Sequence, residues 1–144
     1  MQDQTFKNHA RMVPLYHYVL LLLVLIFMVT SFVNLYQVAS RGEAMMQALL
    51  FCLLGFIVLL ASWFARSFAL KAQDRAIRAE ENLRYYAITG KLLDVNLTAS
   101  QIVALRFAPN NEFADLAHKA IENNMTSKEI KQAIKNWKPD YYRV

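Results

Sequence analysis

Three side chains near the start of the chain, His9, Arg11 and His17, are of types that can move a proton, ligate a metal or bind a lipid headgroup. Two histidines do not complete a metal shell, and the third histidine, His118, lies far along the chain. We therefore expect no bound metal and no cofactor. The simpler interpretation of this candidate inner-face polar cluster is an interfacial histidine that anchors a helix by hydrogen bonds.

A second candidate is a row of basic side chains near the carboxyl end. Its members lie at i, i+3, i+7 and i+10: Lys128, Lys131, Lys135 and Lys138. On one continuous helix this spacing places all four on one face, opposite Ile130, Ile134 and Trp137. Such a lysine row can contact anionic headgroups or nucleic-acid phosphates. The simpler explanation, which we favour, is an ordinary solvated face of an amphipathic helix.

No combination of a nucleophile and a base is recognisable in the sequence. The only glycines are Gly42, Gly55 and Gly90, so there is no glycine-rich phosphate loop. The single cysteine, Cys52, lies in an apolar run, which excludes a disulfide framework. We predict a protein that is not an enzyme and has no catalytic residues.

Two apolar runs, residues 15–36 and 44–65, contain no Asp, Glu, Lys or Arg. Each is about 22 residues long, and a helix needs roughly 20 to cross the hydrocarbon layer of a bilayer. The two runs predict a transmembrane hairpin over residues 15–65, joined by the turn signal Ser40-Arg41-Gly42. Small residues let membrane helices approach closely. We expect one row of them to face the first span: Ala44, Ala48, Cys52 and Gly55.

The charges outside these runs predict the orientation. The chain has 144 residues, 56% of them hydrophobic, and a net charge of +5. Basic residues crowd the segment after the second run, and such residues tend to stay in the cytoplasm. We therefore expect an interfacial head over residues 1–14 and both termini in the cytoplasm. A cleaved signal peptide is the competing interpretation of the first run, but that run is long and Gln37-Val38-Ala39 is a poor cleavage context.

The second run should continue as a long helix. Residues 66–90 are rich in strong helix formers, and Gly90 is placed to end the helix. Asp74 with Arg78, and Glu80 with Arg84, are expected i,i+4 pairs. Small and apolar residues recur there in heptad spacing: Ala65, Ala69, Ala72, Ala76, Ala79, Leu83 and Tyr86. This spacing is typical of a contact with a partner helix, in this chain or another. The alternative is that alanine is simply a common residue on an exposed helix.

Residues 91–144 predict a small unit of three short helices. Thr98 with Gln101, and Thr126 with Glu129, match the capping-box pattern. Pro109-Asn110 should end the first helix and cap the second. The third should begin after Thr126, carry Ile130, Ala133, Ile134 and Trp137 on its apolar face, and stop at Pro139. The expected fold class is all-α: a two-helix transmembrane hairpin whose second helix extends into the cytoplasm, followed by the three-helix unit.

Four segments spread over the whole chain resemble a known family. They are QDQTFKNHARMVPLYHYVLL, FARSFALKAQDRAIRAEENLR, TGKLLD with the LT, QI and ALRFA that follow, and KEIKQAIKNWKPDYYRV. They resemble an uncharacterised bacterial family of short two-span membrane proteins that carries only a domain-of-unknown-function label. The resemblance implies this architecture and a bacterial inner membrane, and it brings no activity, cofactor or catalytic residue.

Three functions follow as hypotheses. The first is a non-catalytic, membrane-anchored interaction or accessory subunit, whose partners are membrane lipids and another membrane or cytoplasmic protein or a second copy. The second is a membrane tether for nucleic acid or the ribosome through the lysine row. The third is a lipid-modifying enzyme that uses His9, Arg11 and His17. We favour the first, because no reaction can be built from the side chains present.

Overall fold

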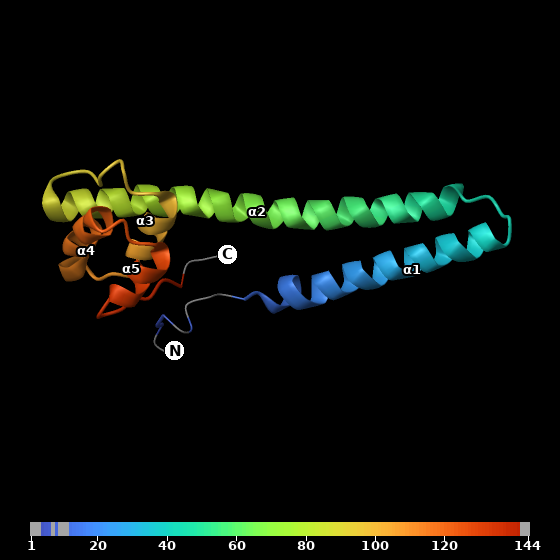
Figure 1. Ribbon diagram of the computed structural model, residues 1–144, viewed down its shortest axis with the longest axis horizontal. Helices are drawn as coiled ribbons and strands as arrows, with labels where there is room; N and C mark the ends of the chain where they lie inside the picture. The colour runs from blue at the N-terminus through green and yellow to red at the C-terminus, as the bar shows by residue number, and fades with distance from the viewer. Residues whose placement is uncertain (1–3, 7, 9–11, 142–144) are drawn as a thin grey trace. The chain divides into compact units, whose positions relative to one another are not determined.

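The computed structural model describes residues 4–6, 8 and 12–141, and this part of the chain is all-helical, without strands (Figure 1). A π-helical turn, Leu15–Leu20, leads into α1, Leu21–Ser40. The others are α2, Met46–Thr89; α3, Ala99–Leu105; α4, Asn110–Glu122; and α5, Ser127–Ala133. The all-α prediction is confirmed. Residues 12–68 form one unit, and the described residues of 1–11 and 69–144 form the other.

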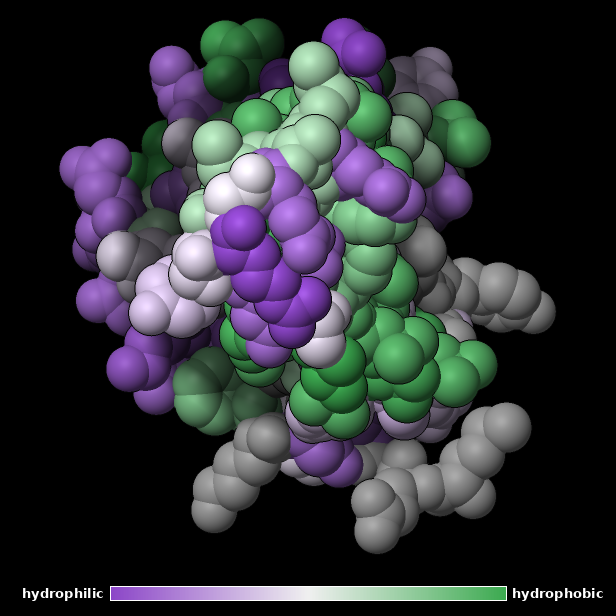
Figure 2. Space-filling model, turned by 90° about the vertical axis from the view of Figure 1, so that its right-hand side faces the viewer, coloured by the Kyte–Doolittle hydropathy of each residue, from purple (hydrophilic) through white to green (hydrophobic). Residues whose placement is uncertain are grey.

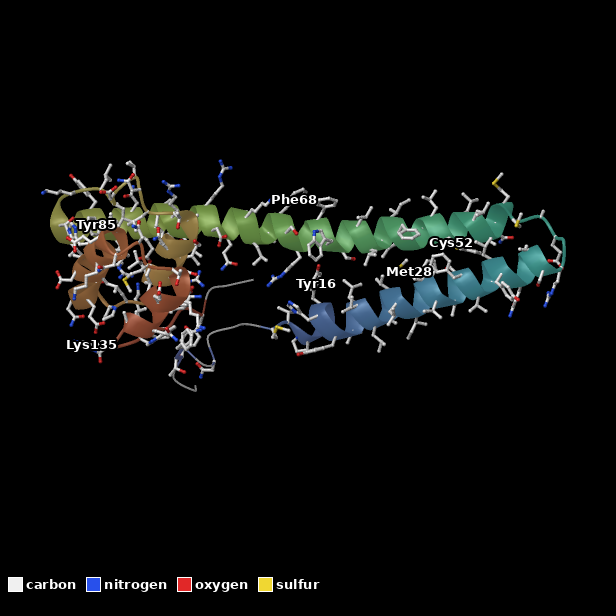
Figure 3. The ribbon with its side chains drawn as sticks, in the orientation of Figure 1. Tyr16, Met28, Cys52, Phe68, Tyr85 and Lys135 are labelled. Atoms are coloured by element: carbon white, nitrogen blue, oxygen red, sulfur yellow. The ribbon has the colours of Figure 1, made fainter. Side chains whose placement is uncertain are left out.

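The first unit is a hairpin in which α1 runs antiparallel to the first part of α2 (Figure 1). Ala48 and Cys52 are only 2% and 9% exposed, and Gly55 is buried. A Cβ atom on Gly55 would lie 3.2 Å from Cγ of Met28. In Figure 3, Met28 and Cys52 lie between the two helices. The predicted small-residue contact row is confirmed from Ala48 to Gly55, whereas Ala44 is exposed and precedes α2.

The outer surfaces of the hairpin are apolar. On α1 the side chains of Leu21, Leu22, Leu23 and Leu25 are each more than half exposed, and Leu50, Leu53 and Ile57 on α2 are similar. Seen from the end where α1 and α2 are joined, hydrophobic residues in green reach the molecular surface (Figure 2). Within the described residues, Leu15–Ser40 and Met46–Thr89 have the length and composition of membrane-crossing helices.

Enlarging Gly55 should weaken this hairpin. We expect Gly55→Leu to destabilise it by about 1–3 kcal/mol, because the new side chain overlaps Met28 and Phe27 and overpacking of close contacts has this cost. Thermal melting of the full chain in detergent, followed by circular dichroism, measures the change. Leu53→Val, at an exposed site on the same helix, is the matched control. A Gly55→Leu melting curve that coincides with the control would contradict the close helix contact.

The second unit begins on α2, which continues without a break to Thr89 as predicted. Gly90 follows with a φ of +72°, and its N–H donates to the carbonyl of Tyr86 at 2.8 Å. This is the left-handed position after a helix end that glycine occupies without strain.

The three short helices pack around one apolar core. Its largest fully buried side chains are Ile102, Leu105, Phe107, Phe113 and Ile130. Both predicted capping boxes are present, at Thr98 for α3 and at Thr126 for α5. The prediction for α4 was wrong in one detail. Pro109 occupies the cap position without a side-chain bond, and Asn110 is already helical.

The last helix is shorter than predicted. It ends at Ala133, and Ile134 is extended with a ψ of 122°. The carboxylate of Glu112 on α4 accepts the backbone N–H groups of Lys135 at 3.0 Å and Asn136 at 3.2 Å. The N–H of Lys138 donates to the carbonyl of Phe107 at 2.8 Å. These tertiary bonds replace the intrahelical ones that the i,i+4 pattern of Ile130, Ile134 and Trp137 had suggested.

Candidate functional site

The predicted heptad residues of α2 lie on an exposed face of the second unit. We call the row from Ala69 to Tyr86 the heptad face; it consists of Ala69, Ala72, Ala76, Ala79, Leu83 and Tyr86. Ala69 is half-buried and the others are exposed, with Leu83 at 69% and Tyr86 at 53%. No helix of the described part of this unit covers the face. A partner helix for this face therefore stays a prediction.

The short helices pack on another face of α2, which presents Ile77, Glu81 and Tyr85. Tyr85 meets Phe113 edge-to-face with ring centroids 5.7 Å apart, and its hydroxyl lies 3.2 Å from Nε2 of His118 on α4. Figure 3 shows Tyr85 beside the short helices and Lys135 on the far side of them from α2. The spacing i, i+4, i+8 puts these three α2 residues on one stripe, roughly half a turn from the heptad face.

A buried ion pair lies within this packed face. Nη1 of Arg84 is 2.9 Å from Oε2 of Glu81, and both side chains are nearly inaccessible. Nη2 of Arg84 donates to the carbonyl of Ala108 at 2.6 Å, and the guanidinium lies 4.0 Å from the ring centroid of Phe113. Arg84 therefore pairs with Glu81 rather than with Glu80, the expected i,i+4 partner. The pair fastens α2 to the segment that joins α3 to α4.

A second ion pair fastens the carboxyl-terminal segment. Nε of Arg106, a residue only 8% exposed, is 3.2 Å from Oδ2 of Asp140, and its guanidinium lies over the ring of Phe107 at 4.6 Å. Gln4 bonds to the backbone of Asp140 in both directions, accepting from its N–H at 2.8 Å and donating to its carbonyl at 3.3 Å. Part of the head thus packs with the carboxyl-terminal segment in one unit.

A cleft of about 370 Å³ separates α2 from residues 138–141. Glu81, Arg106 and Asp140 line it with Glu80 and Lys138. Burial raises the pKa of Glu81 above its ordinary value, although Arg84, Lys138 and Arg106 lower it in part. The cleft contains charges of both signs. Its two most buried charged residues, Glu81 and Arg106, already form ion pairs with other residues of this unit. Among the described residues, no cluster of three or more His, Cys, Asp or Glu could hold a metal ion.

The lysine row does not form the single helical stripe that its spacing suggested. Lys128 and Lys131 lie on α5, but Lys135 and Lys138 follow the end of that helix. Their backbone N–H groups are held by Glu112 and Phe107, so the chain leaves the helical path between Lys131 and Lys135. The expected common face of all four lysines was wrong, for the tertiary reason given above.

Of the predicted inner-face cluster, His17 alone lies in the described part of the chain; His9 and Arg11 lie outside it. Nδ1 of His17 is 3.0 Å from the backbone N of Val13 and 2.9 Å from its carbonyl oxygen. The hydroxyl of the adjacent Tyr16 donates to the carbonyl of Ser62. His17 thus bonds to the backbone just before the first helix, and Tyr16 bonds to the backbone of α2. A largely apolar cavity of about 170 Å³ adjoins both side chains.

A family model described as a family of unknown function, DUF6526, matches residues 1–144. The chain belongs to this family. No curated protein and no solved structure matches it. The resemblance found in the sequence is confirmed in one respect: the whole chain matches a family of unknown function. Membership in DUF6526 brings no activity or site residue with it.

The buried charges of this DUF6526 member were not predicted from its sequence. Glu81, Arg106 and Asp140 were assigned no role, and Arg84 was expected to pair with Glu80 on the surface of the helix. Glu112 was not distinguished from other surface carboxylates. One signal was available for Glu81, since Ile77 and Tyr85 flank it at four-residue spacing on a helix whose heptad residues point elsewhere. Arg106 and Asp140 lie in segments without periodicity, where a sequence gives no pairing.

Proposed function

We propose that this chain is an integral membrane protein whose hairpin, residues 15–65, crosses the bilayer twice. The observation that carries the proposal is the exposed apolar surface on both hairpin helices, because water would meet side chains such as Leu23 and Leu53 that are more than half exposed. The core helix of a soluble protein buries such residues. Membrane lipids are then the first partners of the chain.

We place both ends of the chain on the cytoplasmic side of a bacterial inner membrane. Two spans return the chain to the side on which it began. The bonds between Gln4 and Asp140 support this, since they require head and tail on one side of the membrane. Basic residues after the second span, among them Arg66, Lys71 and Arg75, favour the cytoplasm for that side.

The role that we propose is non-catalytic: a membrane-anchored interaction or accessory subunit. Its buried charges hold the chain together, because Arg84 and Arg106 bind carboxylates, aromatic rings and backbone carbonyls of the same unit. The heptad face, by contrast, is an exposed apolar surface. The divided lysine row gives less support to a nucleic-acid tether, and the backbone bonds of His17 give less support to a lipid-modifying enzyme.

Single cysteines test the topology in cells. In a Cys52→Ala background, we expect a membrane-impermeant maleimide to label Glu43→Cys, in the short loop, on intact spheroplasts. It should label Val95→Cys, which is 85% exposed in the second unit, only after lysis. Carbonate washing should leave both variants in the membrane pellet. Labelling of Val95→Cys from outside would reverse the topology, and recovery of the chain in the supernatant would end the membrane assignment.

Crosslinking in native membranes followed by mass spectrometry tests the interaction role. We expect crosslinks to another polypeptide or a second copy from Lys71, which lies between Ala69 and Ala72 in the chain, or from Lys91, which follows the heptad face. Crosslinks confined to one chain, together with purely monomeric protein in mild detergent, would contradict an interaction subunit.

A further inference from the structure

The heptad face has the layout of a two-helix coiled coil. Ala69, Ala76 and Leu83 take the first position of successive heptads, and Ala72, Ala79 and Tyr86 take the fourth. The short helices of the same unit pack around Ile77, Glu81 and Tyr85, at the second, sixth and third positions. At 3.6 residues per turn these lie roughly opposite the heptad face. The fold therefore uses one side of α2 and leaves the coiled-coil side accessible.

The charges beside this face favour a specific partner. In a parallel, in-register pair of helices, the seventh position of one heptad faces the fifth position of the next heptad in the partner. On α2 these positions hold Arg75 and Glu80, both exposed. A second copy in this arrangement brings Arg75 of each chain next to Glu80 of the other. The two chains then form two equivalent pairs of opposite charge.

Membrane anchoring supplies the orientation. If the hairpin spans the bilayer, as proposed above, every copy of α2 leaves the membrane in the same direction, so two copies can meet only in parallel. Alanine at most of the contact positions lets the helices approach closely. Leu83 and Tyr86 add apolar area at the far end. We propose that the heptad face of α2 binds the same face of a second copy, forming a parallel, two-fold symmetric dimer.

Disulfide crosslinking in native membranes tests the dimer. In the Cys52→Ala background, Ala76→Cys and Ala79→Cys should each form a disulfide dimer upon mild oxidation, because paired contact positions bring the two sulfurs within bonding reach. Arg78→Cys, one residue away and exposed outside the heptad face, is the matched control. We expect at least about a fivefold lower dimer fraction from it. Equal crosslinking at all three sites, no crosslinking, or a disulfide to a different protein would overturn the proposal.

A charge exchange tests the register. Arg75→Glu places like charges at both inter-chain contacts and should lower the Ala79→Cys dimer fraction several-fold. Adding Glu80→Arg to the same chain restores opposite charges and should restore the dimer. A loss that Glu80→Arg does not rescue would exclude this parallel register. Carbonate washing of the same membranes separates the two proposals: protein retained in the pellet without crosslinks overturns the dimer alone, and protein in the supernatant overturns the membrane anchor.

Discussion

Phe113→Ala should remove most of the stability of the helical unit. The Phe113 side chain is fully buried, lies 4.0 Å beneath the guanidinium of Arg84, and meets the ring of Tyr85 edge-on. Replacing a buried phenylalanine by alanine costs about 3–5 kcal/mol, as lost burial plus the cavity that remains. A unit of this size has a total stability of the same order, roughly 3–5 kcal/mol. We therefore expect the short helices to detach from α2 and become sensitive to protease.

Urea unfolding of the full chain in detergent measures this loss, with Trp137 fluorescence as the probe and Trp63→Phe to remove the other tryptophan. Trp137 packs on Phe107 at a centroid distance of 4.9 Å, so its emission reports the state of the core. Phe113→Leu should lose less, about 1–2 kcal/mol, because it keeps most of the volume. Val95→Ala, at an 85% exposed site, should be close to neutral. A Phe113→Ala protein within 1 kcal/mol of the parent would show that this core does not hold the unit together.

The parts of this fold that could be predicted from the sequence depend on neighbours in the chain. Thr98 and Thr126 find their partners three residues on, and Gly90 ends a helix by its own backbone freedom. The close contact at Gly55 follows from a row of small residues on one helix. Each of these signals spans a few residues, and the structure departs from them only at Ala44, which lies before the start of α2.

The parts that could not be predicted depend on contacts between distant residues. Nothing near Ile134 ends α5; the carboxylate of Glu112, more than 20 residues earlier, takes the N–H groups that a longer helix would have used. Lys128 and Lys131 therefore lie on α5 and the other two lysines lie beyond its end, although the spacing of all four in the sequence is regular. In the same way, the sequence places Glu81 and Arg84 on a charged, solvent-exposed helix. In the structure the short helices cover them.

Removing Arg84 from its ion pair with Glu81 should lower the stability of the helical unit as much as Phe113→Ala does. We expect Arg84→Met to destabilise the unit by about 3–5 kcal/mol near neutral pH, because Glu81 is left buried without its nearest positive charge. The carbonyl of Ala108 also loses its donor. The double variant Glu81→Leu with Arg84→Met removes the stranded carboxylate and should recover at least about 2 kcal/mol, since apolar replacement of a whole buried pair is often nearly neutral. Urea unfolding of the parent, the single variant and the double variant measures both changes.

The pH dependence of the stability of these three proteins shows whether the unpaired carboxylate of Glu81 causes the loss. Burial already raises the pKa of Glu81 in the native protein, and removing Arg84 takes away the strongest effect that lowers it. A carboxyl whose native pKa exceeds the unfolded value, about 4.3, binds its proton more tightly in the native state. Its protonation therefore favours folding below that value, and this contribution is lost as the pH rises through the native pKa. The Arg84→Met loss should be smaller at pH 5 than at pH 7.5, and the double variant should lack that difference. If Arg84→Met loses the same stability at both pH values, the damage comes from the unbonded carbonyls and the lost packing on Phe113, and Glu81 is not its source.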